Sequence, residues 1–461
     1  ERIDSPNTPR YASLALALLS AVVLPVCPLL AATWIVAQDG SGDFTEIQPA
    51  IDAAQAGDLI LVKPGTYASI VVNKAVTIVG SGEDQTIVSD AGSSEGWAVL
   101  ISDLAGDALI AYLRAKGDKS LISTIAPGGR YIAWRIVTES TEPGAVGVGD
   151  VAAAWLNNVA EYHDPSETYA WAESPAGMGA MLCRSVFVSQ CHFTMWDRGD
   201  YGTFRGGAGI GVGWDARVFI AETNAIGGAG GYGYWGEDCN YSQKGGTGGA
   251  GVYLYRDYVY DSAEAYIFGR PENLIRGGKG GRGKDDFVPT CDLVGPGGDG
   301  GEGIWVEWSS GVATYAGVTP EGGLPGSGDP PGAWGPPTRG NVTEIPFVAT
   351  STMEGDGKPG STASFSFHGR AGDRLLIAYS TRLDVLELSQ TEGHPLMVSP
   401  TGTFGLIPAG TIDASGTKTI SALIPADMSP GQPFYVQGIV LDGGPPEITN
   451  LSMLVTTPVW N

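Results

Sequence analysis

The sequence predicts an all-β protein whose body is a parallel β-helix with a capping helix at its N-terminal end, followed by a small antiparallel β-sandwich. Three observations support this fold class. Short apolar runs are separated by glycine turns, one amphipathic helix precedes them, and glycine contributes 70 of the 461 residues. Hydrophobic residues make up 43% of the chain, with 12 Trp and 18 Tyr, which indicates a folded protein rather than a low-complexity one.

The charge of the chain is strongly acidic, with 26 basic and 50 acidic residues and a net charge of −24. A field of this sign repels DNA, RNA and anionic membrane surfaces, so the composition argues against nucleic-acid binding. It would also repel an acidic polysaccharide unless a divalent cation bridged the two.

Residues 1–32 have the pattern of a signal peptide. Arg10 precedes an apolar run over residues 14–30, and the small residues Ala31 and Ala32 follow it. The run contains two prolines and is short for a membrane span. We therefore expect a secreted or cell-surface protein with no membrane span in the mature chain. The β-helix is then expected to begin at residue 33 and to extend to residue 323.

The pattern over residues 45–57 predicts an amphipathic helix. Thr45 is expected to be the N-cap, with Gln48 three residues later as in a capping box. Positions 47, 50, 51 and 54 form one apolar face, and Gly57 supplies a stop. We expect this helix to cover the open end of the stack, where apolar core and unpaired amides would otherwise be exposed.

The runs around and after the helix are too short for a sheet with helical crossovers and are typical of a solenoid, in which coils stack on one another. The first predicted strands cover residues 34–36, 59–62, 70–72, 75–79 and 86–89.

A resemblance supports this interpretation. From Val36 to Val88 the chain reads VAQDGSGDFTEIQPAIDAAQAGDLILVKPGTYASIVVNKAVTIVGSGEDQTIV. This stretch resembles the opening of pectin methylesterases and related proteins of the pectin-lyase-like group, which implies a right-handed parallel β-helix. The catalytic blocks of the esterases are missing, because the nearest match to the nucleophile block is AYIFG, with Ala265 in place of the aspartate. We therefore expect no inherited esterase site.

Residues 206–323 contain glycine-rich repeats, in which we expect glycine to supply corners of positive φ and places of close backbone approach. Two runs, beginning at Lys244 and Pro296, align well and lie 52 residues apart. Cys239 and Cys291 have the same spacing. We favour two coils per repeat, which would separate these two cysteines too far for a disulfide. The pairing among the four cysteines after the signal peptide stays open; they are Cys183, Cys191, Cys239 and Cys291.

Residues 324–341 are rich in proline and glycine and are predicted to be a linker. Residues 342–461 alternate like the strands of a compact β-sandwich. The segments GRAGDRLLIAYS and TIDASGTKTISALIPADMSPGQPFYVQGIVLDGG resemble a C-terminal module of secreted bacterial β-helix proteins. The strands predicted here cover residues 363–367, 375–379, 417–424 and 434–441.

Aromatic residues form the best candidate binding site. Alignment of the repeats places Tyr253 opposite Trp305, with Trp214 at a nearby position in the preceding run. Tyr255 and Trp308 flank them. A solvent-facing ladder of flat rings can stack on sugar rings without any charge. The alternative is that these rings pack between coils.

A polysaccharide lyase would require acidic residues that bind Ca²⁺ and a basic residue on one face of the helix. Asp257, Asp261, Glu264 and Arg270 offer these groups within one repeat. The alternative is that they are corner residues of a solvated sheet. A calcium-binding glycine repeat is nearly matched once, at Gly297 to Trp305, with Glu302 in the place of the aspartate, but the other runs lack the carboxylate. We therefore expect no bound metal and no cofactor.

The leading functional hypothesis is a secreted, non-catalytic protein that binds an extracellular polysaccharide or cell-surface glycan, or that builds surface structure. The runner-up is a carbohydrate-active enzyme, either a lyase or a pectinesterase-like esterase, that acts on an extracellular polysaccharide. An enzyme would need at least two carboxylates and a base that converge in a groove.

Overall fold

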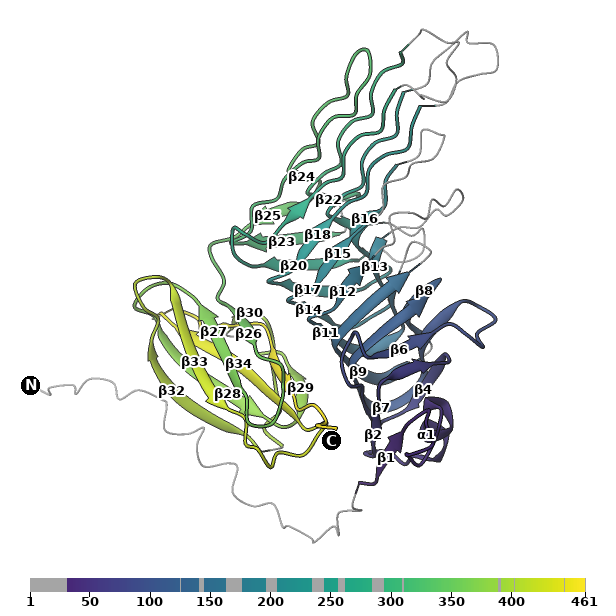
Figure 1. The fold of residues 1–461 in the computed structure, drawn as a ribbon. Helices are drawn as coiled ribbons and strands as arrows, with labels where there is room; N and C mark the ends of the chain where they lie inside the picture. The colour runs from purple at the N-terminus through teal and green to yellow at the C-terminus, as the bar shows by residue number, and fades with distance from the viewer. Residues whose placement is uncertain are drawn as a thin grey trace, which may run out of the picture. The chain divides into compact units, whose positions relative to one another are not determined.

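The computed structural model describes residues 31–124, 126–140, 145–162, 176–195, 205–233, 244–255, 262–283, 294–308, 311–388, 391–401, 403–442 and 444–460. The predicted signal peptide lies almost entirely outside these residues, as do Cys239, Cys291, Asp257 and Asp261. Within them, 25 strands form one parallel system and the C-terminal strands form small, mostly antiparallel sheets (Figure 1), so the predicted fold class is confirmed.

The strands of the β-helix run along the chain as β1 (Thr33–Val36), β2 (Leu59–Val62), β3 (Gly65–Tyr67), β4 (Ile70–Lys74), β5 (Thr77–Val79), β6 (Thr86–Ser89), β7 (Trp97–Gly117), β8 (Lys119–Thr124), β9 (Ala126–Ser140), β10 (Val146–Gly149), β11 (Val151–Asn157), β12 (Ala160–Tyr162), β13 (Ala176–Met181), β14 (Val186–Ser189), β15 (His192–Thr194), β16 (Ala208–Gly213), β17 (Arg217–Ala221), β18 (Asn224–Ile226), β19 (Val252–Leu254), β20 (Glu264–Phe268), β21 (Ile275–Arg276), β22 (Ile304–Val306), β23 (Val312–Ala316), β24 (Thr338–Arg339) and β25 (Val342–Glu344).

Each middle coil contributes one strand to each of three rows. Strands such as β8, β10, β13, β16, β19 and β22 pair in sequence and form what we call the groove row. Strands such as β5, β7, β9, β11, β14, β17 and β20 form the docking row. Strands such as β12, β15, β18 and β21 form the third row. Inward-facing residues of all three rows build one continuous apolar core, as expected for a solenoid.

The predicted capping helix is α1 (Ile47–Ala53), and Ile47, Ala50 and Ile51 are buried against the first coils. The predicted capping box is wrong. The N-cap is Glu46, whose side chain makes no capping hydrogen bond, and Gln48 instead accepts a hydrogen bond from the backbone of Val71 at 2.7 Å. The backbone of β4 therefore occupies the glutamine oxygen that would otherwise accept the hydrogen bond of a capping box.

The corners between the docking row and the third row are occupied by residues other than glycine. Tyr112, Arg135, Asn158, Gln190 and Glu222 all have positive φ, between 49° and 57°. Asn158, Gln190 and Glu222 each follow the end of a docking-row strand, and Tyr112 and Arg135 interrupt β7 and β9 at the corresponding place, so the five corners stack on one another. Left-handed backbone costs such residues about 1 kcal/mol or more each, so the stacked coils hold a conformation that these residues disfavour on their own.

The glycine runs have another role. Among the described glycines of residues 206–323, Gly317 has positive φ but those of the glycine runs do not, so the expectation of glycine corners is wrong for the runs. In the run after Lys244, the amide of Gly248 donates to Asp299 O at 2.9 Å and the amide of Gly249 donates to Gly228 O at 2.8 Å. Successive glycines thus bond to different neighbouring runs, with the three-residue period of a polyproline II helix.

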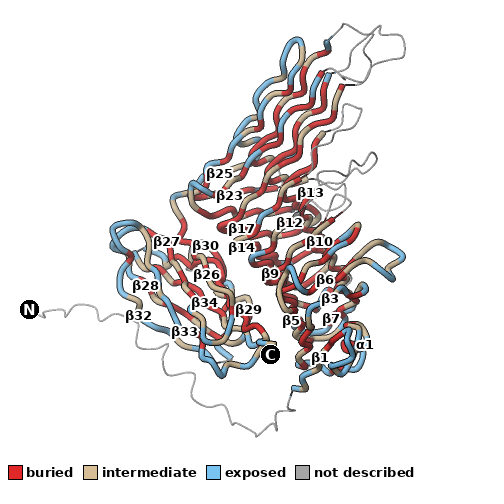
Figure 2. Tube along the Cα trace, viewed as in Figure 1, coloured by how far each residue is buried: buried red, intermediate tan, exposed pale blue. Residues whose placement is uncertain are grey.

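These runs form two layers, drawn as the long wavy segments beyond β22 and β24 in Figure 1. The first glycine of each triplet bonds within its layer and the second bonds to the opposite layer, whereas the third position admits larger residues such as Thr247 and Lys279. A Cβ atom on Gly248 would lie 2.0 Å from Gly278 O, so close backbone approach, the other predicted role, requires glycine here. Figure 2 shows buried and exposed residues alternating along these runs.

The 52-residue repeat is one wide coil and not two, because Val252 pairs directly with Ile304. Each such coil is wide because the chain passes through two glycine runs before it returns to the groove row. The predicted linker also belongs to the stack: Gly326 donates to Gly298 O, β24 pairs with β22, and β25 pairs with β23. Sequence composition misleads here, since linkers and polyproline II helices both favour proline and glycine.

The C-terminal domain follows at residue 350. Its described strands are β26 (Thr350–Glu354), β27 (Thr362–His368), β28 (Arg374–Ser380), β29 (Leu383–Leu386), β30 (Glu392–Gly393), β31 (Leu396–Val398), β32 (Gly405–Thr411), β33 (Thr417–Leu423), β34 (Pro433–Leu441), β35 (Glu447–Ile448) and β36 (Ser452–Val455). One sheet has the order β26-β27-β33, and the other contains β30-β35-β34-β28-β32 with β36 beside β34. The four strands predicted for this domain are present.

Four rings on the outer face of the docking row stack one above another. Trp155, Phe187, Phe219 and Tyr266 have centroid separations of 5.5, 5.1 and 4.9 Å along the row. Side chains of the C-terminal domain pack on this ladder: the Trp155 indole N–H donates to Met397 Sδ at 3.1 Å. No local pattern in the sequence predicts this ladder, because its members lie 32 or 47 residues apart.

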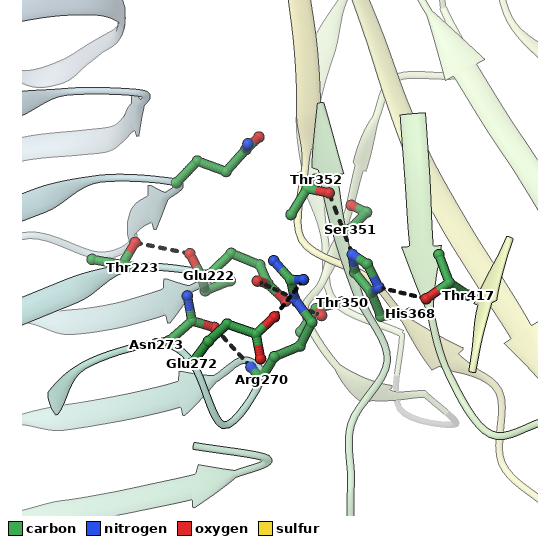
Figure 3. Close-up of polar contacts among 12 residues, drawn as sticks. Glu222, Thr223, Arg270, Glu272, Asn273, Thr350, Ser351, Thr352, His368 and Thr417 are labelled. Carbon is green, nitrogen blue, oxygen red and sulfur yellow. Dashed lines mark hydrogen bonds and ion pairs between the residues drawn. The ribbon is translucent and has the colours of Figure 1, made fainter. Parts of the chain in front are cut away.

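The stacked corner residues bind the C-terminal domain through polar contacts. The Gln190 amide accepts from Met353 N at 2.9 Å and donates to Met353 O at 3.1 Å, and the Tyr112 hydroxyl donates to Asp356 O at 2.6 Å. Glu222 accepts hydrogen bonds from the Thr350 hydroxyl and, at 2.8 Å, from Arg270 Nε (Figure 3). Burial raises the pKa of Glu222, although both of these partners favour its ionised form.

Candidate functional site

A groove runs across the coils on the outer face of the groove row. Its floor contains Gly147 and Gly179, which pair with each other, and Ile122 continues the same register below them. Neighbouring residues Val146 and Val148 point into the core, so the glycines face outward. Because these glycines have no side chains, a groove of about 440 Å³ opens above the sheet.

The side of the groove is formed at the corner between the groove row and the docking row. Leu182 and Trp214 have positive φ, at 55° and 50°, and occupy this corner in successive coils. The Leu182 amide donates to Trp214 O at 2.9 Å, which holds the two residues one above the other. Both side chains line the groove, and Leu182 is 38% exposed. The strained corner thus presents an indole and an isobutyl group along one edge.

Tyr255 lies beside the groove on the next coil. A Cβ atom on Gly213 would lie 2.5 Å from the Tyr255 ring, and a Cβ atom on Gly211 would lie 3.4 Å from it. The ring therefore covers these two glycines. Gly211 is in register with Gly179 of the groove floor and with Tyr253 on the following coil. The floor of small residues thus leads into the predicted aromatic positions.

Tyr253 and Trp305 are brought together as the repeat alignment predicts. Their rings stack at a centroid distance of 4.4 Å and an interplanar angle of 16°. The Arg205 guanidinium carbon lies 3.9 Å from the Trp305 ring centroid, and that of Arg339 lies 5.2 Å from it. The faces of Trp305 are therefore occupied by other side chains, as in the packing alternative. Trp308, beyond β22, is 49% exposed.

Glu302 holds this cluster together. It is 3% exposed and pairs with both Arg205 and Arg339, the latter at 2.9 Å. The carboxylate at the calcium-like position of the sequence is therefore committed to two arginines. The Tyr253 hydroxyl donates to Glu307 at 2.6 Å, so each polar group named in this cluster has a partner.

The residues considered for a lyase do not converge where the structure describes them. Glu264 accepts a hydrogen bond from the Tyr266 hydroxyl at 3.0 Å and lies 3.3 Å from Arg217. Arg270, beyond the other end of β20, pairs with Glu222 and Glu272. Asp257 and Asp261 lie outside the described residues. Ala265, in the position of the esterase nucleophile, is buried in the core.

The described residues contain no group of three or more His, Cys, Asp or Glu side chains that could hold a metal ion. Cys183 and Cys191 are buried and have free thiols. Burial raises the pKa of Cys183 to about 11 and that of Cys191 to about 12, so both are inert hydrophobic groups at neutral pH. A helix of the length and hydropathy needed to cross a bilayer is absent from the described part of the chain.

No protein-family model matches the chain, and no curated protein matches it in sequence. Among solved structures, full-length tailspike protein 2 from Escherichia coli O157:H7 bacteriophage CAB120 aligns with 94% of this chain at 10% identity and a TM-score of 0.26. The enzymatically active domain of tailspike protein 4 from bacteriophage CBA120 aligns with 87% of it at 11% identity and a TM-score of 0.21. The aligned part covers 64% of each of these two chains. The fold described here rests on the strand pairing of this chain itself.

Proposed function

We propose that this chain is a secreted, non-catalytic β-helix protein that binds an extracellular polysaccharide or cell-surface glycan in the groove across the groove row. The observation that carries the proposal is the open glycine floor beside the half-buried Trp214. A pyranose ring can place its C–H face on such an apolar surface while its hydroxyl groups remain at the polar rim.

The charges of the groove support a neutral or basic glycan. The lining includes one cation, Lys119, and one carboxylate, Asp150, and the whole chain carries a net charge of −24. Hydrolysis of a glycosidic bond ordinarily requires a pair of carboxylates that flank the bond. Since Asp150 is the single carboxylate in the described lining, binding without cleavage is the activity that this groove supports best.

The predicted aromatic residues take different roles in this proposal. Trp214 supplies the stacking surface and Tyr255 borders it. Tyr253, on the same coil as Tyr255, supports Tyr255, and Trp305 of the next coil stacks on Tyr253. Tyr253 and Tyr255 have ring centroids 5.8 Å apart, which allows this support.

The test uses a variant that fills the groove. No atom lies within 4 Å of a Cβ built on Gly179, so Gly179→Leu should fold normally while its side chain occupies the floor. We expect Gly179→Leu to abolish binding on a glycan array and Trp214→Ala to weaken it about tenfold, the value of one aromatic stack of about 1.4 kcal/mol. The matched control is Trp334→Ala, since Trp334 is 67% exposed in a glycine run away from the groove. Unchanged glycan retention by Gly179→Leu would remove the groove as the site.

A further inference from the structure

A second cavity, of about 460 Å³, lies between the docking row and the C-terminal domain. The β-helix contributes residues of β5, β7, β9 and β11 to its lining. The C-terminal domain contributes the segment around β29, the residues after β31 and part of β34. Neither part of the chain forms this cavity by itself. We call it the composite cleft.

The floor of the composite cleft is one row of side chains on successive coils. Thr77 pairs with Leu109, Leu109 with Ile132, and Ile132 with Trp155. Beyond Trp155 the same row continues as the aromatic ladder that the C-terminal domain covers. Four rungs at the ordinary strand spacing extend about 14 Å, so the floor is an elongated strip. Leu109, Ile132 and Trp155 are only 3–5% exposed, so polar groups provide most of the accessible lining.

Charged groups of both signs rise beside this strip. Arg130 binds Asp107 through two hydrogen bonds of 2.6 Å, and its remaining nitrogen lies 3.6 Å from Asp384 of the C-terminal domain. A second arginine, Arg382, is exposed at the cleft. Two cations therefore balance two carboxylates, so the cleft has no net preference for an anion or a cation.

Hydroxyl groups complete the polar lining. Thr77 comes from the β-helix, and Thr381, Ser399 and Thr401 come from the C-terminal domain. A lining of hydrogen-bond donors and acceptors without net charge fits an uncharged ligand that carries many hydroxyl groups. Arg382 can donate hydrogen bonds to such hydroxyl groups and Asp384 can accept them. Among biological ligands this chemistry belongs to neutral sugars, and the elongated floor suits an oligosaccharide.

We infer that the composite cleft is a second binding site, for a neutral or N-acetylated oligosaccharide, whose two walls come from the β-helix and the C-terminal domain. The site is independent of the groove described above, because it lies on a different row of the β-helix. It also assigns the C-terminal domain a direct part in recognition, in place of a role as a spacer or an anchor only.

The test measures binding of three named probes to the full chain by titration calorimetry: maltotriose, N-acetylchitotriose and trigalacturonate. Arg382→Ala removes an exposed donor of the cleft, and Arg374→Ala removes an exposed cation elsewhere in the same domain as the control. Urea unfolding verifies that both variants fold. We expect one of the two uncharged trisaccharides to bind, Arg382→Ala to weaken that binding at least tenfold, and Arg374→Ala to leave it unchanged.

The variant Gly179→Leu separates this site from the groove. Binding that persists in Gly179→Leu and is lost in Arg382→Ala supports the composite cleft even if the groove proposal fails. Binding that is retained in Arg382→Ala overturns the inference, whatever Gly179→Leu does. Binding of trigalacturonate alone, or of none of the three probes, also overturns it, because the charge-balanced lining should select an uncharged sugar.

Discussion

The rings of Tyr253 and Trp305 stack at 4.4 Å although 52 positions separate them along the chain. The contact forms because each wide coil leaves the β-helix, passes through two glycine runs and returns to the groove row in register. The glycine runs pack together as a bundle, the glycine bundle, and this packing determines where the aromatic residues meet. Its backbone-to-backbone packing is therefore expected to be the most sensitive structural element of the middle of the chain.

Gly248→Ala is expected to destabilise this bundle severely. The new methyl group would lie 2.0 Å from the carbonyl oxygen of Gly278, and backbone cannot move aside as a flexible side chain can. Overpacking of this kind costs about 1–3 kcal/mol, and occasionally more. Thr247→Ala, at the adjacent third position of a triplet, should change stability by less than about 0.5 kcal/mol. Urea unfolding compares the two variants, and equal midpoints would contradict the packing described here.

Phe219→Ala is expected to cost about 3–5 kcal/mol, because the ring is buried between Phe187 and Tyr266 in the ladder of the docking row. Loss of this ring also removes a contact with His394 of the C-terminal domain. Limited proteolysis between residues 344 and 350 should therefore accelerate in the variant. Phe404→Ala, at a partly exposed position, is the control and should leave the cleavage rate unchanged.

Glu302→Ala should lower the free energy of unfolding by about 2 kcal/mol, because it leaves Arg205 and Arg339 without their shared carboxylate. The arginines are partly exposed, so water limits the loss. Lys244→Ala breaks the exposed pair with Asp299 and should cost less than about 1 kcal/mol. If the two variants unfolded at the same urea concentration, the central role of Glu302 would be contradicted.

Acid should weaken the C-terminal domain. Burial lowers the pKa of His368 to about 4 and that of His394 to about 3, whereas histidine in the unfolded chain has a pKa of about 6.5. Below about pH 6.5 the unfolded state binds protons that the folded state does not bind, so the free energy of unfolding falls as the pH decreases. For His368 this fall ends at about pH 4.

Between about pH 7 and about pH 5, His368 should contribute a loss of about 2 kcal/mol. His368→Gln removes this titration and keeps a side chain that can bond to Thr352 or Thr417. Urea unfolding at the two pH values should show a smaller loss in the variant. An equal loss in the variant and the parent chain would show that His368 does not carry the effect.

Local patterns determined much of the fold. The capping helix, the short strands after it and the four predicted strands of the C-terminal domain follow from apolar periodicity and turn residues, which depend on near neighbours in the chain. The facing of Tyr253 and Trp305 was predictable for a similar reason, since a repeat aligned in sequence is also aligned in space when coils stack.

Tertiary structure alone decided the rest. The glycine-rich repeats were visible in the sequence, but whether glycine serves a turn or a backbone contact depends on which runs become neighbours. The ladder from Trp155 to Tyr266, the corner residues that bind β26 and the composite cleft all join residues that lie far apart in the chain. Stacking of coils converts such separations into distances of about 5 Å, and no local property of the sequence records which residues will share a row.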